Sequence, residues 1–170
     1  VDGLQNLRPP RGRMRVVEGI KSTTLIDDTY NSSPIAVEAA LQTLNEIKHA
    51  KRKIVVLGDM LELGKFSSAE HHKIGKIVPT VAGMLITVGV RSRKIAEGAL
   101  AAGMDEANIL QYESVDRAGK ELQNILESGD VVLVKASQGI RAEKIIEEVM
   151  AEPELAPSIL VRQSKTWLRK

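Results

Sequence analysis

Short apolar runs alternate with amphipathic segments along most of this chain. The clearest run is Lys53-Ile-Val-Val-Leu57, and further runs cover residues 84–88, 108–112 and 131–135. Continuous apolar runs of this length are typical of strands that are buried on both faces of a parallel sheet. Few other arrangements place so many unbroken apolar runs between polar segments, so this pattern constrains the fold more than any other feature.

The intervening segments have the period of helices. In residues 35–50, Val37, Leu41 and Leu44 fall on one face. Further helices are predicted over 67–82, 92–102, 114–126, 139–150 and 159–168. Ser67 and Glu70 have capping-box spacing, and Pro79 should break its helix. Strands that alternate with helices predict an α/β fold, with a mostly parallel, doubly wound (Rossmann-like) sheet of about six strands and helices on both faces.

The N-terminal part differs from this pattern. Residues 14–20 and 23–27 are apolar and β-branched, and they predict an N-terminal β-hairpin. Residues 1–13 contain Pro9 and Pro10 and predict a linker. Because the chain begins at Val1 rather than Met, we expect residues 14–170 to be one domain of a longer protein, with residues 1–13 as the hinge before it.

A polar turn joins the hairpin to the first helix. It carries Asp27, Asp28, Tyr30 and Asn31 and ends at Ser33-Pro34, which suit the N-cap and the first helical position. Ligands of open α/β sheets bind at the carboxyl ends of the strands, where this turn is predicted. Carboxylates can accept hydrogen bonds from sugar hydroxyls, and an Asn amide can pair with a base edge. The alternative is an ordinary turn in which Asp and Asn bond only nearby backbone.

Composition excludes several function classes. A net charge of +2 argues against nucleic-acid and membrane partners, and an aromatic content of 2% argues against base-stacking platforms. The absence of Cys excludes disulfides, thiolate catalysis and Cys-type zinc sites, and it is compatible with the cytoplasm. His71 and His72 would point about 100° apart on a helix, so packing is favoured over metal binding.

The segment after the strand at 53–57 superficially matches a phosphate-binding loop. Five residues separate Gly58 from Gly64 where the motif has four, and Phe66 stands where Ser or Thr must reach magnesium. We therefore expect no phosphate loop in this chain. Asp59 and Glu62 form either a solvated loop or a contact with an amine-bearing group.

The segment from Lys135 to Arg141 follows the last strand and is predicted to open a helix. Its N–H groups, with the two cations beside them, would bind a carboxylate or phosphate, and the alternative is a solvated turn. Lys135 and the acidic residues also outline a phosphoacceptor receiver domain. The outline is superficial, because Asp59 ends the next strand in sequence and Ala136 stands where a receiver has proline.

Together these segments resemble the C-terminal domain of the Mur ligases, most closely the type that adds D-alanyl-D-alanine. The resemblance spans about residues 7–150 and is carried by Gly12-Arg13-Met14, Asp27 to Asn31 with Pro34, Val56 to Gly64, His71 to Gly75, and Val134 to Ser137 with Arg141 and Glu143. The chain departs from the family at Ser32-Ser33, where Ala-Asn is frequent, and at Ala136 and Gln138, where Gly and Arg are frequent.

The resemblance implies an ATP-dependent, amide-bond-forming ligase of three domains that works through an acyl phosphate. An N-terminal domain holds UDP-N-acetylmuramoyl-tripeptide, a central domain carries the phosphate loop and Mg²⁺, and the C-terminal domain closes over both. The product is a peptidoglycan precursor. This chain would hold no catalytic residue and no metal ligand, and we expect it to be inactive alone. Its partners would be the other domains of a monomeric cytoplasmic enzyme.

The resemblance also assigns binding residues. Arg13, Asp28, Tyr30 and Asn31 would bind ATP, with Asp28 on the ribose and Asn31 and Tyr30 on the adenine. D-Alanyl-D-alanine would be bound by Asp59, Glu62, Lys135, Ser137 and Arg141. The alternatives are another Mur-type ligase, a folylpolyglutamate-type ligase, and a stand-alone receiver-like or nucleotide-binding module.

Overall fold

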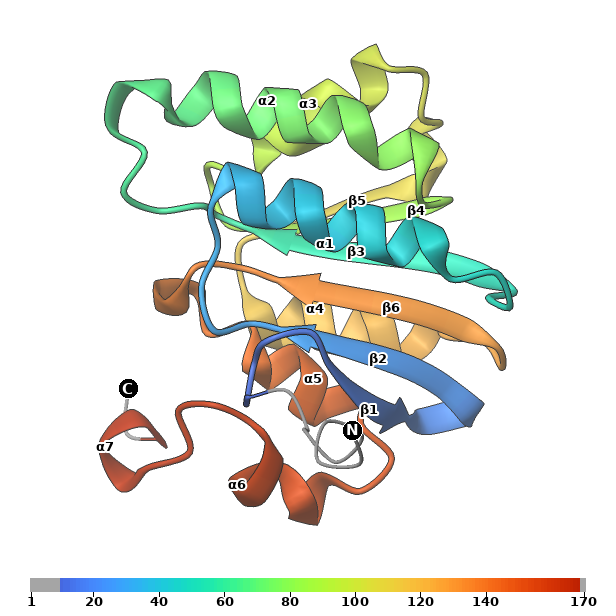
Figure 1. The fold of residues 1–170 in the computed structure, drawn as a ribbon, viewed down its shortest axis with the longest axis vertical. Helices are drawn as coiled ribbons and strands as arrows, with labels where there is room; N and C mark the ends of the chain where they lie inside the picture. Colours follow the sequence, from blue (N-terminus) through green and yellow to red (C-terminus); the bar gives the residue numbers. More distant parts are fainter. Residues whose placement is uncertain (1–9, 169–170) are drawn as a thin grey trace, which may run out of the picture.

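A computed structural model describes residues 10–168. Residues 1–9 of the predicted hinge, with 169–170, lie outside this range. The described chain contains a six-stranded sheet of order β1-β2-β6-β3-β4-β5 (Figure 1). Its strands are β1 (Arg15–Gly19), β2 (Thr23–Asp28), β3 (Arg52–Gly58), β4 (Met84–Val88), β5 (Ile109–Tyr112) and β6 (Asp130–Lys135). Only β1 runs antiparallel, so both the mostly parallel sheet and the N-terminal hairpin are confirmed.

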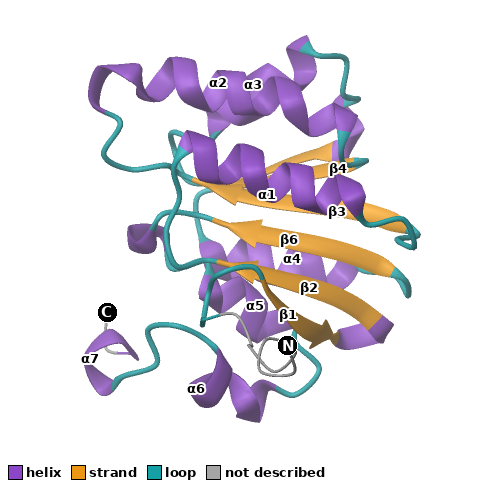
Figure 2. Cartoon of the chain, in the orientation of Figure 1, coloured by secondary structure: helices purple, strands orange, loops and turns teal. Residues whose placement is uncertain are grey.

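Helices cover both faces of this sheet. One face packs against α1 (Pro34–Glu46), α2 (Ser67–Ile77) and α3 (Arg93–Ala101), and the other against α4 (Val115–Ile125) and α5 (Glu143–Val149). Two short helices, α6 (Ala156–Ile159) and α7 (Lys165–Leu168), lie on the side of the β1–β2 hairpin (Figure 2). The 3-10 turns are η1 (Ile20–Ser22), η2 (Gly64–Phe66), η3 (Val78–Thr80), η4 (Glu106–Asn108), η5 (Gln138–Ile140) and η6 (Pro153–Leu155).

Each face of the sheet has its own apolar core. The predicted stripe of α1, including Leu41 and Leu44, packs with Ile74 of α2 and Ile95 of α3. Ile145 belongs to the cluster on the opposite face, with residues of α4 and of the sheet. Fully burying a side chain of this size contributes roughly 1.5–3 kcal/mol. The two cores hold the strands rigidly and thereby fix the loops at their ends.

The position of β6 determines where the functional loops meet. This strand is the last in sequence, yet it lies between β2 and β3. Lys135 at its end is paired with Asp28 of β2 on one side and with Leu57 of β3 on the other. The loops that follow β2, β6 and β3 therefore leave the sheet side by side at its carboxyl edge, the usual ligand site of such folds.

The ends of two helices test the capping predictions. Ser33 caps α1 by accepting a hydrogen bond from Ala36 N, and Pro34 is the first helical residue, as predicted. The capping box at Ser67 is wrong, because the turn η2 runs directly into α2 and Ser67 is already helical. Pro79 lies in the 3-10 turn that follows the end of α2 at Ile77, which agrees with the predicted break.

The C-terminal helices differ from the prediction. The helix expected over 139–150 begins only at Glu143, because Arg141 adopts a left-handed conformation (φ 65°) after the turn η5. The single helix expected over 159–168 is divided into α6 and α7. Within residues 10–168, no helix combines the length and the apolar character that crossing a bilayer requires.

Candidate functional site

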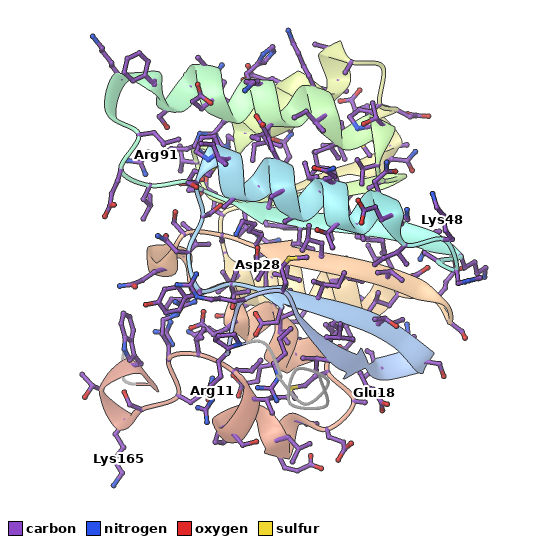
Figure 3. All side chains as sticks on the ribbon, viewed as in Figure 1. Arg11, Glu18, Asp28, Lys48, Arg91 and Lys165 are labelled. Carbon is purple, nitrogen blue, oxygen red and sulfur yellow. The ribbon has the colours of Figure 1, made fainter. Side chains whose placement is uncertain are left out.

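Two adjoining hollows lie at the carboxyl edge of the sheet. The larger, of about 740 Å³, is bordered by the loops after β2, β3 and β6 and by Trp167. The smaller, of about 470 Å³, lies between the first of these loops, α1 and the segment before β1. Residues 31–33 line both. Figure 3 shows Arg91 at this edge and Lys48 at the opposite edge.

Asp28 and Lys135 form a buried ion pair on the floor of the smaller hollow. Lys135 Nζ lies 2.6 Å from Asp28 Oδ2 and also donates a hydrogen bond to the carbonyl of Asn31, at 2.9 Å. Asp28 Oδ1 accepts a hydrogen bond from Met14 N at 3.2 Å. The sequence predicts a substrate ligand at Lys135, whereas the structure gives its ammonium group internal partners and places it at the smaller hollow.

Asp27 behaves as the ordinary turn residue of the alternative interpretation. Its Oδ1 accepts hydrogen bonds from the N–H and the hydroxyl of Thr29, at 3.2 and 2.6 Å. Its Oδ2 is buried and has no hydrogen-bond partner among residues 10–168. Burial raises the pKa of Asp27, although the hydrogen bonds from Thr29 act in the opposite direction. Asp27 therefore stabilises the turn itself, whereas Asp28 lines the smaller hollow.

Arg13 and Tyr30 stand together at the rim of the smaller hollow. The Arg13 guanidinium lies 4.3 Å from the centroid of the Tyr30 ring, within the range of a cation–π contact. Tyr30 N donates a hydrogen bond to the carbonyl of Gly12, whose φ of +65° suits glycine. The Asn31 side chain is exposed beside them. All four predicted ATP-binding residues therefore converge on one hollow.

Ser137 joins the three loops at the floor of the larger hollow. Its Oγ accepts a hydrogen bond from Leu61 N at 2.9 Å and donates one to the carbonyl of Ser32 at 3.3 Å. Its N–H donates to the carbonyl of Asp59 at 3.0 Å. The chain ends of β2, β3 and β6 are thus fixed relative to one another through this one residue.

The structure separates Asp59 from Glu62. Asp59 is buried, and its carboxylate accepts a hydrogen bond from Ser92 N at 2.7 Å and lies 3.7 Å from an Arg91 guanidinium nitrogen. It therefore holds the loop between β4 and α3. Glu62 is exposed, has a left-handed backbone (φ 67°) and lines the larger hollow. Of the two carboxylates predicted near an amine, only Glu62 borders the space that could hold one.

Arg141 lines the larger hollow, but its guanidinium also has partners within the domain. Its Nε lies 2.6 Å from Glu143 Oε1, and its Nη1 donates a hydrogen bond to the carbonyl of Trp167 at 2.9 Å. Arg162 approaches the same carboxylate from the C-terminal tail, with Nη2 2.7 Å from Oε2. Sequence reasoning assigned no role to Arg162 or Trp167, and it quoted Glu143 only as part of the family pattern. The pairing of Glu143 with Arg162 joins residues that are distant in sequence, and such a contact leaves no local pattern that could have revealed it.

His71 has the packing role that the sequence favours. Its Nε2 accepts a hydrogen bond from Met60 N at 2.9 Å, so its Nδ1, 2.7 Å from the carbonyl of Ser67, is the protonated nitrogen. Burial lowers the pKa of His71. In the part of the chain that the structure describes, no group of three or more His, Asp or Glu side chains could hold a metal ion.

Comparison with known proteins identifies the architecture. The family model described as Mur ligase, glutamate ligase domain, matches residues 12–138. The chain belongs to this family. The family resemblance seen in the sequence is therefore confirmed.

Curated relatives of this Mur ligase domain include two UDP-N-acetylmuramoyl-tripeptide–D-alanyl-D-alanine ligases. That of Bacillus subtilis (strain 168) is 30% identical over 152 residues, which cover 89% of this chain and 33% of the relative. That of Mycobacterium tuberculosis (strain ATCC 25618 / H37Rv) is 33% identical over 164 residues, which cover 85% and 32%. The chain thus spans about a third of the length of these relatives.

A solved structure has the same fold. The crystal structure of MurF ligase from Thermotoga maritima in complex with ADP matches with a TM-score of 0.72 and 27% identity. The match covers 87% of this chain and 32% of that one. The α/β architecture with its N-terminal strand pair is therefore that of a solved Mur ligase.

Proposed function

We propose that this Mur ligase domain is the C-terminal part of an ATP-dependent ligase that adds D-alanyl-D-alanine to UDP-N-acetylmuramoyl-tripeptide. Both curated relatives named above are ligases of this type. The observation that carries the proposal is the pair of hollows that share residues 31–33. Because the hollows adjoin, this one domain could hold a nucleoside and an incoming amine side by side. The reaction would supply a precursor of peptidoglycan.

The reaction forms one amide bond at the expense of ATP. The terminal carboxylate of the tripeptide attacks the γ-phosphorus of ATP, and ADP leaves. The dipeptide amine, once deprotonated, attacks the acyl carbon, and phosphate departs with the C–O electron pair. This chain would bring the two reactants together, and such positioning alone can lower the activation free energy by several kcal/mol.

The smaller hollow suits the nucleoside. A carboxylate can accept about four hydrogen bonds, so Asp28 retains acceptor capacity for ribose hydroxyls after bonding Met14 N and Lys135. Asn31 can pair with a base edge, and the stacked Arg13 and Tyr30 offer a flat surface for adenine. Lys135 would act by fixing Asp28 and the carbonyl of Asn31 rather than by touching the dipeptide.

The larger hollow suits the dipeptide. Glu62 would bind its ammonium group, and Arg141 and Ser137 its carboxylate. Arg141 carries five N–H donors, of which the bonds to Glu143 and Trp167 use only part. Asp59 would contribute indirectly, by holding the loop after β4 through Ser92.

Magnesium and the phosphates do not fit the residues described here. Among residues 10–168, no group of three or more His, Asp or Glu side chains could hold a metal ion, and the spacing of Gly58 and Gly64 is not that of a phosphate loop. We propose that both belong to the central domain of the longer enzyme. The hinge over residues 1–13, the monomeric state and the cytoplasmic location are parts of the same proposal.

The test compares the full-length ligase with this chain alone. We expect the full-length protein to release phosphate from ATP when given the UDP-tripeptide and D-alanyl-D-alanine, and this chain alone to release none. Asp28→Asn in the full-length protein should raise the KM for ATP. Turnover by the chain alone, or an unchanged KM and rate in Asp28→Asn, would contradict the proposal. Preference for a single amino acid or for glutamate as the amine would favour the other ligase types.

A further inference from the structure

The C-terminal tail reaches the proposed nucleotide loop. The family match ends at residue 138, and the tail, defined here as residues 153–168, lies beyond it. Arg162 of this tail donates hydrogen bonds to two successive carbonyls of the loop after β2. Its Nη2 lies 2.5 Å from Thr29 O, and its Nη1 lies 3.2 Å from Tyr30 O. The tail therefore fixes the backbone between Asp28 and Asn31.

One buried carboxylate holds Arg162 in this position. Glu143 is completely buried, and its two oxygens bind Arg162 at 2.7 Å and Arg141 at 2.6 Å. The Arg162 side chain is itself only 5% exposed. A buried carboxylate is costly unless it is paired and hydrogen-bonded, and here each oxygen has a guanidinium partner. The arrangement is therefore held as a unit rather than as two independent surface pairs.

The backbone of both arginines supports this interpretation. Arg141 has φ 65° and Arg162 has φ 56°, a left-handed conformation that costs energy for residues other than glycine. Such conformations persist where the surroundings impose them, and they gather at functional sites. Both residues contact Glu143 from this backbone conformation.

We propose that Arg162 is a positioning residue for nucleotide binding, and that Glu143 couples it to the substrate hollow through Arg141. Arg162 fixes the carbonyls of Thr29 and Tyr30, so that Asp28, Tyr30 and Asn31 face the nucleoside. Glu143 fixes Arg141 at the larger hollow through its other oxygen. This inference rests on the proposed function, and it assigns a role to a segment outside the family match.

Other contacts of the tail provide a matched control. Arg15 donates a hydrogen bond to the carbonyl of Ile159 at 3.4 Å. It therefore fastens the same tail to β1 without contacting the loop at 29–31. If the tail served only for stability, Arg162→Ala should lower the thermal midpoint more than Arg15→Ala, since the Arg162 side chain is almost fully buried and has more partners, but neither variant should change the KM for ATP. If Arg162 positions the loop, only its replacement should change the use of ATP.

The experiment measures the KM for ATP, the KM for D-alanyl-D-alanine, kcat and the thermal midpoint in the full-length ligase. For Arg162→Ala we expect the KM for ATP to rise about tenfold, with a smaller change for the dipeptide. Arg162→Lys should show the same selective rise, because an ammonium group cannot replace the planar fork that reaches three oxygens. Glu143→Gln should raise both KM values, and Arg15→Ala should leave both within about twofold of wild type.

Each outcome decides between the two roles. Equal KM ratios in Arg162→Ala and Arg15→Ala would overturn the inference, whatever their thermal midpoints. If the circular dichroism spectrum of Arg162→Ala shows that this variant is unfolded, the KM ratios of Arg162→Lys to wild type decide instead. A wild-type enzyme without ATP- and dipeptide-dependent turnover would refute the proposed function instead, so the two failures are distinguishable.

Discussion

Lys135 Nζ lies 2.6 Å from Asp28 Oδ2, at the point where β6 and β2 end side by side. The two residues are 107 positions apart in sequence. Lys135 is 3% exposed, so its charge is stabilised by the pair and by the carbonyl of Asn31 rather than by water. This pair connects the last strand of the sheet to the loop that we propose for the nucleoside.

Replacing Lys135 by Met should therefore destabilise the chain by about 3 kcal/mol, because removal of one partner leaves a buried carboxylate uncompensated. Urea unfolding of this chain measures the change. The double variant Asp28→Asn, Lys135→Met should recover part of the loss. Lys94→Met breaks an exposed pair with Glu97 and should cost less than about 1 kcal/mol. Equal losses of stability in Lys135→Met and Lys94→Met would contradict the argument that burial makes the first pair important.

Gly75 marks the close approach of α2 to α3. A Cβ at this position would overlap the carbonyl oxygen of Ile95, which belongs to the backbone and cannot move aside. We expect Gly75→Ala to cost about 1–3 kcal/mol or more, despite the better helix propensity of alanine. A Cβ at Gly83 would meet nothing, so Gly83→Ala should be neutral or slightly stabilising. Thermal unfolding compares the two variants with wild type. A Gly75→Ala variant as stable as wild type would refute the packing argument.

His71→Ala should destabilise the chain by about 1–3 kcal/mol, because the N–H of Met60 would lose its buried acceptor. The exposed His49 is the control, and His49→Ala should have little effect. Urea unfolding at neutral pH measures both changes.

The same histidine predicts a dependence on pH. Burial lowers the pKa of His71 in the folded state, so below about pH 6.5 the unfolded chain binds the proton more readily. Stability from this group is thus present above that pH and is lost as the pH falls toward the folded pKa. His71→Gln should reduce this loss between pH 7 and pH 5. An identical pH profile in wild type and variant would exclude His71 as its source.

The titration of Asp27 predicts a pH dependence of stability that is opposite in sign to that of His71. Burial raises the pKa of Asp27 in the folded state. Its contribution to the free energy of unfolding is therefore fully present below about pH 3.9, the pKa in the unfolded chain, and is lost as the pH rises through the folded pKa. Asp27→Asn cannot titrate, and it should therefore gain stability relative to wild type between pH 4 and pH 7. Asp116→Asn, at an exposed position, controls for the lost charge. A constant difference between Asp27→Asn and wild type across this range would contradict the prediction.

Local patterns were sufficient for most of the sheet. The run predicted at 84–88 coincides with β4, and the runs at 53–57 and 131–135 lie within β3 and β6, because unbroken apolar runs have few other uses. Helix ends were less predictable. Ser67 has the spacing of a cap, yet the preceding turn η2 continues into the helix and removes the need for one.

The site was predictable only as far as the strand-end rule reaches. That rule brought the loops at 28–31 and 135–141 to one edge, and they do meet there. It could not show that Lys135 faces Asp28, nor that Arg162 reaches Thr29, because both contacts depend on how distant segments pack.

The insertion of β6 between β2 and β3 has a consequence for synthesis on the ribosome. Until residues 130–135 emerge, β2 and β3 each lack the neighbour that the finished sheet provides. Unpaired strand edges are ready templates for association with other chains. At roughly 5–20 residues per second, the nascent chain would carry both edges for several seconds before the last strand arrives. The sheet can therefore be completed only after residue 135 has been synthesised, although five of its six strands are made before β6.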